Sequence, residues 1–202
     1  LADAQRYYET HYSPENGTAV FVGDVDPAAL QAMCARYFGR LKPSPVKPDP
    51  VVTVEPAQTA ERRITAEADA NDEINVEWHG PSGVHRDSAA CDLLMSVFAG
   101  RSGRLYRPLV EEKRLALDTE SYFWSLRYGG VIHVGATPRE GADFDEVEKA
   151  LLGIVEEVRK HGVTERELRK AKNQQIANLL RDMKTESGLA GPPIELAFGH
   201  AR

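Results

Sequence analysis

Little in the sequence points to a disulfide scaffold, a membrane protein or a nucleic-acid binder. Only two of the 202 residues are cysteines, Cys34 and Cys91, and both lie in apolar helical patterns, which favours free thiols over a disulfide. No apolar run approaches the roughly 20 residues of a membrane-spanning helix. The net charge is −6, and no cluster of lysines and arginines is present to neutralise phosphates, so we expect no nucleic-acid partner. These absences leave an acidic globular protein.

Catalytic motifs are missing as well. The chain has six histidines, but none is arranged as H-E-x-x-H or H-x-x-E-H, the spacings that place two imidazoles on one helical face. His79 and His85 lack an acidic third ligand at helical spacing, and His133 stands alone in a predicted strand, so we interpret all three as ordinary histidines. No G-x-S-x-G is present, and the glycine-rich corner at 100–103 lacks the G-K-[ST] of a phosphate loop. The sequence therefore predicts no catalytic residue and no metal ligand.

The first part of the chain predicts a helix, a strand and a second helix. Residues 2–11 have an amphipathic helical pattern, and residues 18–25 are a β-branched, aromatic run typical of a buried strand. Asp26 followed by Pro27 begins the second helix, because an acceptor at the N-cap and proline at the first position suit a helix start. The stretch 42–57 is rich in proline and predicts a stiff linker.

The second part predicts an alternation of paired strands and helices. The expected strands cover 61–68, 72–79, 116–126 and 130–137, the last two as a hairpin. Two of the expected helices cover 87–98 and 143–160. Another ends near Glu112, with a kink or late start at Pro108. The fourth begins at the capping box Thr164–Glu167 and has Leu179 and Met183 on its inner side. A further helix is expected near Ser187. The fold class is α+β, a mainly antiparallel sheet with helices packed on one face.

Five stretches, in order, resemble the pitrilysin/insulinase family of zinc peptidases (M16). They are residues 5–24 (QRYYETHYSPENGTAVFVGD), 30–41 (LQAMCARYFGRL), 91–117 (CDLLMSVFAGRSGRLYRPLVEEKRLAL), 162–174 (GVTERELRKAKNQ) and 186–190 (ESGLA). The family's segments Y-x-P-x-N…GD, SRL…LRe…gLaY and GvteeEl are similar to the first, third and fourth of these. Each motif is weak alone, but their common order makes the resemblance specific.

The resemblance implies two related α+β domains in each half of a peptide chamber. Residues 1–41 would then be the helix–strand–helix tail of a preceding catalytic-type domain, 42–57 the linker, and 58–202 a non-catalytic domain lacking its last elements. The zinc motif H-x-x-E-H would lie upstream, so no cofactor is expected in this chain, and zinc is expected in a parent zinc metalloendopeptidase. The alternative is a zinc-less scaffold or assembly subunit of the same family.

The resemblance also implies site residues and partners. Alignment on LRe…gLaY places Val110 at the family's arginine and Leu117 at its tyrosine, and neither side chain can donate a hydrogen bond. Arg104 and Tyr106, in the same block, are the candidates for contact with substrate. Expected partners are the chain's own catalytic domain, a homologous subunit that supplies the Arg/Tyr pair, and extended peptides. A bacterial source is implied, and the family favours the periplasm over the cytoplasm.

One further expectation concerns the sheet edge. If the last helix and strand of the non-catalytic domain are missing, residues 2–25 offer an equivalent helix and strand. An unpaired sheet edge invites a partner strand, so residues 18–25 are predicted to pair with the strands of residues 60–137, within one chain or between two.

Overall fold

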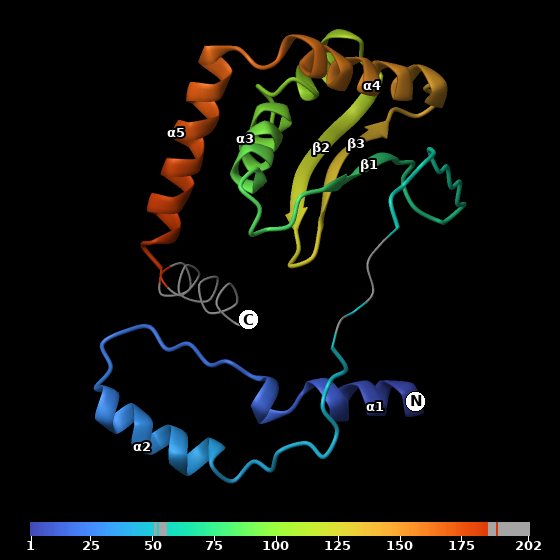
Figure 1. Cartoon of the computed structure of the whole chain (residues 1–202). Coiled ribbons are helices and arrows are strands. Elements are labelled where there is room, and N and C mark those ends of the chain that lie inside the picture. The colour runs from blue at the N-terminus through green and yellow to red at the C-terminus, as the bar shows by residue number, and fades with distance from the viewer. Residues whose placement is uncertain (51, 53–55, 186–188, 190–202) are drawn as a thin grey trace. The chain divides into compact units, whose positions relative to one another are not determined.

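The computed structural model describes residues 1–50, 52, 56–185 and 189, and divides the chain into two units. One unit comprises Leu1–Ala66 and Asp182–Arg202, and the other comprises Glu67–Arg181. In Figure 1 the second unit carries the labels β1, β2 and β3 for its strands and α3, α4 and α5 for its helices. The helix expected near Ser187 falls outside the described residues.

The first unit contains two short helices. They are α1 (Ala2–His11) and α2 (Pro27–Phe38), with a 3-10 turn at Pro14–Asn16 between them. As the sequence predicts, Asp26 caps α2, because its Oδ1 accepts a hydrogen bond of 2.8 Å from the Ala28 amide. None of the described residues of 1–66 is buried. This unit therefore has no hydrophobic core of its own among the described residues.

Two predicted strands are wrong. Residues 18–25 and 61–68 contain no strand. The pairing of residues 18–25 with the sheet, which would join the two units, stays a prediction. Apolar and alternating patterns set which face a strand would bury, but a strand also needs a neighbour for its ladder of hydrogen bonds. The sheet of the described residues consists only of β1, β2 and β3.

The sheet of the second unit has three antiparallel strands in the order β1-β3-β2. The strands are β1 (Ile74–Gly80), β2 (Ala116–Ser125) and β3 (Gly130–Pro138), so the predicted hairpin is confirmed. In the register, Val134 of β3 lies opposite Val76 of β1 and Ser121 of β2. Because side chains alternate along a strand, these residues share one face, which is the core face.

Helices cover the core face. They are α3 (Ser88–Phe98), the π-helix η2 (Arg107–Glu112) and α4 (Phe144–His161). Figure 1 shows α3 beside β2. The buried cluster joins β3 to these helices through Met95, Phe98, Leu105, Leu109, Val110, Ala116, Val134, Ala136, Val147, Leu151 and Val158. The helix α5 (Glu165–Asp182) follows α4 along the chain and contributes no residue to the buried cluster. The α+β class, with an antiparallel sheet and helices on one face, is confirmed.

Two helices differ in detail from the prediction. The helix ending at Glu112 begins only at Arg107, in agreement with a late start at Pro108, which has no amide hydrogen to donate. In α5, Ala171 is buried and Leu179 is 52% exposed, and Met183, directly after the helix, is 46% exposed. The prediction that the latter two lie on an inner side is wrong, because the ties of α5 to other elements described below end at Gln175. No helix among the described residues is long and apolar enough to cross a membrane.

Candidate functional site

The two positions aligned with the family's Arg/Tyr pair lie in different surroundings. Val110 lies in η2, is only 8% exposed and belongs to the buried cluster. Leu117 lies in β2 at a register irregularity between Ala116 and Asp118, and is 54% exposed. Neither side chain presents a hydrogen-bond donor, so these two positions offer no polar contact to a peptide.

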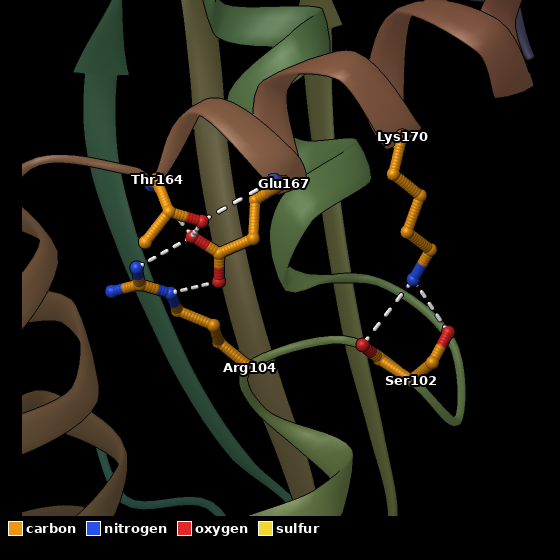
Figure 2. Close-up of polar contacts among 5 residues, drawn as sticks. All are labelled: Ser102, Arg104, Thr164, Glu167 and Lys170. Carbon is orange, nitrogen blue, oxygen red and sulfur yellow. Dashed lines mark hydrogen bonds and ion pairs between the residues drawn. The ribbon is translucent and has the colours of Figure 1, made fainter.

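Arg104 forms an ion pair with the first turn of α5. Its Nε and Nη2 donate to Oε1 and Oε2 of Glu167 over 2.6 and 2.7 Å, a bidentate pair with both side chains largely buried (Figure 2). Glu167 Oε2 also accepts from the amide and hydroxyl of Thr164, which completes the predicted capping box. The Arg104 guanidinium thus holds α5 in place. Its contact with substrate stays a prediction, as does that of the half-buried Tyr106.

Two further polar contacts tie α5 to the segment before η2. Lys170 Nζ donates to the hydroxyl and carbonyl oxygens of Ser102 over 2.5 and 3.3 Å, as Figure 2 shows. Gln175 Nε2 donates to Ser96 Oγ over 2.9 Å. A hollow of about 350 Å³ beside Arg104 and Glu167 is lined in part by two ion pairs, Arg104–Glu167 and Arg107–Glu112. We interpret this cluster as a structural clamp on α5.

The clamp should make the fold sensitive to acid. The hydrogen bonds from Arg104 lower the pKa of Glu167 from 4.5 to about 2. Since the folded-state pKa lies below the unfolded one, this stabilisation is fully present above about pH 4.5 and is lost as the pH falls towards 2. Unfolding midpoints in urea, measured from pH 7 to pH 2.5, should fall less steeply for Glu167→Gln than for the wild type. Equal slopes would contradict a stabilising pair.

The face of the sheet opposite the core carries acidic, histidine and aromatic side chains. We call it the open face. It consists of every second residue of the three strands, together with Glu73, which directly precedes β1. Its members are Glu73, Asn75, Glu77, His79, Asp118, Glu120, Tyr122, Trp124, Val131, His133, Gly135 and Thr137. The three strands contain no lysine or arginine. Carboxylates lie towards one end of this face and aromatic rings towards the other.

His133 lies at the centre of the open face and is only 3% exposed. Its Nδ1 is 3.3 Å from Glu77 Oε1 on β1, and its Nε2 is 3.2 Å from Glu120 Oε1 on β2. The ring of Tyr122 stacks on the imidazole, with centroids 4.3 Å apart and planes 8° apart. A neutral imidazole can donate to only one of the two carboxylates, whereas the imidazolium donates to both. His133 thus lies within hydrogen-bond distance of an acidic side chain on each outer strand.

A small hollow of about 110 Å³ opens at the acidic end of this face. Its lining includes the side chains of Glu73, Asn75, Asp118 and Glu120. Gly135 in the central strand leaves no room for a side chain, because a Cβ there would lie 2.7 Å from Asn75 Oδ1 and 2.9 Å from His133 Nε2.

The residues of the open face do not fit a zinc site. Zinc needs three or four close nitrogen, sulfur or oxygen ligands, and the buried imidazole of His133 is already flanked by carboxylates at hydrogen-bond distance on both nitrogens. Among the residues that the structure describes, no group of three or more His, Cys, Asp or Glu side chains could hold a metal ion. No chemical step can therefore be assigned to a metal within them.

Sequence reasoning recognised His133 as a lone strand histidine but not its partners. Glu77 and Glu120 lie 56 and 13 residues away along the chain, and only the register of the sheet brings them together. The alternation along the strands indicates that Glu77 and His133 belong to the polar face, because both fall at the polar positions of their strands.

The fold defines an α+β domain, and comparison with known proteins identifies its family. The model of the peptidase M16 inactive domain matches residues 1–175. The chain therefore belongs to the M16 peptidase family and corresponds to its inactive domain, as the sequence resemblance predicts.

Individual relatives agree with this assignment. The chain is 27% identical over 198 residues to a zinc protease, PqqE, of Helicobacter pylori. This alignment covers 95% of this chain and 44% of the relative. The crystal structure of a protease from Helicobacter pylori superposes with a TM-score of 0.85 at 26% identity, over 95% of this chain and 47% of that one. A peptidase M16 inactive domain from Pseudomonas fluorescens shares the fold. It superposes with a TM-score of 0.67 at 22% identity, over 87% of this chain and 42% of that one. The chain spans less than half the length of these relatives.

Proposed function

We propose that this chain is the non-catalytic domain of a zinc metallopeptidase, and that its open face lines a peptide chamber and contacts extended peptide. The observation that carries the proposal is the open face itself. One side of the sheet is buried under helices, while the other presents exposed carboxylates and rings around a buried histidine. Tyr122 and Trp124 are 42% and 61% exposed there, although burying aromatic rings is favourable. A peptide laid along the strands would bury them.

The zinc and the general base of such a peptidase would lie in a separate catalytic domain. Support comes from the match to an inactive-domain family and from the similarity to a zinc protease of about twice this length. The catalytic domain, a homologous subunit with an Arg/Tyr pair, and peptides are the proposed partners. The alternative, a zinc-less scaffold subunit, would lack H-x-x-E-H in its own N-terminal domain, whereas the peptidase would contain it.

The proposed peptide contact predicts binding without cleavage. Fluorescence anisotropy of a labelled, unstructured 15-residue peptide should rise on titration with the 202-residue chain, and the peptide should remain intact. Tyr122→Ala/Trp124→Ala should weaken binding at least roughly tenfold, since two buried rings are lost. The matched control, Tyr7→Ala/Tyr8→Ala, removes two rings that are 60% and 62% exposed on α1 and should bind as the wild type does. Equal binding by both double variants would contradict the proposal.

A further inference from the structure

Along its strands the open face changes from acidic at one end to aromatic at the other. This difference affects the kind of peptide that the face accepts. On β2, Asp118 and Glu120 stand at the acidic end, and Trp124 stands at the other end of the same face. Glu73 adds a third carboxylate to the hollow at the acidic end. No lysine or arginine of the three strands offsets these charges.

We infer that the open face selects extended peptides that carry a cationic side chain and, four residues away, an apolar or aromatic side chain. This inference rests on the proposed function and names its substrate class. The cationic side chain is placed in the acidic hollow, and the apolar side chain lies against Trp124, which is 61% exposed. Charge complementarity favours this occupant over an acidic or neutral peptide.

The spacing follows from strand geometry. Glu120 and Trp124 are four residues apart in β2, which corresponds to about 13 Å at the usual rise per residue. An extended peptide has nearly the same rise, so residues i and i+4 of the peptide span that distance. Because extended side chains alternate, an even spacing places both side chains on the same side of the peptide, whereas a spacing of five places them on opposite sides.

The arrangement of His133 makes part of the acidic end rigid. Its Nε2 lies 3.2 Å from Glu120 Oε1, and the ring itself is fixed between β1, β2 and the stacked Tyr122. Glu120 is still 58% exposed, so its second oxygen can accept from a guanidinium or ammonium group. A carboxylate held in place before binding loses less side-chain entropy when it engages a cation.

The experiment uses the 202-residue chain with Trp78→Phe, which leaves Trp124 as the only tryptophan, since the chain has two. Three peptides of otherwise identical sequence are compared: arginine and phenylalanine four residues apart, the same two residues five apart, and glutamine in place of the arginine. The first should bind at least roughly tenfold more tightly than the other two and quench or shift the Trp124 fluorescence. Its affinity should fall as salt is raised from 0.05 to 0.5 M, because exposed charges are screened.

Two charge variants locate the effect. Glu73→Gln/Asp118→Asn/Glu120→Gln should abolish the preference for the arginine peptide, while Glu111→Gln/Glu140→Gln/Glu146→Gln, which removes the same charge outside the open face, should retain it. If all three peptides bind equally at the open face, the selectivity inference is wrong and the proposed peptide contact stands. If the preference survives Glu73→Gln/Asp118→Asn/Glu120→Gln, the cation is recognised elsewhere and the inference is wrong. If no peptide binds, the inference and the proposed peptide contact both fall.

Discussion

Replacing Leu151 by alanine should lower the free energy of unfolding of the sheet unit by about 2–5 kcal/mol. Leu151 lies in α4, is 0% exposed and belongs to the cluster that joins the helices to β3. Its truncation removes buried apolar surface and leaves a cavity, because close-packed neighbours relax only in part. Urea unfolding followed by circular dichroism gives the difference directly.

A matched substitution separates burial from residue type. Leu180 in α5 is 58% exposed, so Leu180→Ala should change the free energy of unfolding by no more than about 0.5 kcal/mol. A loss for Leu180→Ala as large as that for Leu151→Ala would mean that the exposed half of α5 is covered in solution. Both variants falling within 0.5 kcal/mol of the wild type would contradict the position of the core.

The second large effect concerns the two units. A fragment of residues 67–185 should unfold cooperatively, because the whole buried cluster lies within it. A fragment of residues 1–66 should be largely unfolded, since none of its described residues is buried. Its two α-helices have 10 and 12 residues, and isolated helices of this length are marginal in water.

Circular dichroism and amide proton dispersion of the two fragments measure this difference. The urea midpoint of residues 67–185 should match that of the 202-residue chain, because residues 1–66 contribute no buried contacts among those described. Cooperative unfolding of the 1–66 fragment alone would contradict this view. It would also count against the prediction that residues 1–41 belong to a preceding domain, which needs that domain to cover rings such as Tyr37 and Phe38, each 53% exposed.

Local signals in the sequence predicted most of the helices and the hairpin. The helix at 2–11, the Asp26 cap and the Thr164–Glu167 capping box all rest on contacts within a few residues, and all three are confirmed. The hairpin of β2 and β3 is also a local feature, because the two strands are joined by a short turn. Sequence periodicity is sufficient for such elements, since the interacting groups are close along the chain.

The wrong predictions all required a partner from elsewhere in the chain. Residues 18–25 and 61–68 have strand-like patterns, but no neighbour in the described structure supplies their ladder. Leu179 and Met183 fall on the expected phase of α5, yet the ties that hold this helix, to Ser102 and Ser96, involve its earlier residues. A one-dimensional pattern gives the face that an element would bury and leaves open whether anything covers that face.

In the candidate site, too, local features were predictable from the sequence and features that depend on distant partners were not. The absence of catalytic motifs and the family were readable from the sequence, and so were the substitutions at Val110 and Leu117. The open face was not, because the contacts of His133 with Glu77 and Glu120 depend on the pairing of three strands. Arg104 was singled out as a candidate for peptide contact, but its ion pair with Glu167, 63 residues away, gives it a structural role.

The central claim is that the open face contacts extended peptide, and nuclear magnetic resonance mapping tests it most directly. The 202-residue chain, labelled with nitrogen-15, is titrated with the peptide in which arginine and phenylalanine are four residues apart. Amide shifts should concentrate at 75–79, 118–124 and 131–137, with α4 unchanged. Shifts confined to the exposed residues of α5 or to residues 1–66, with these strands unchanged, would contradict the account.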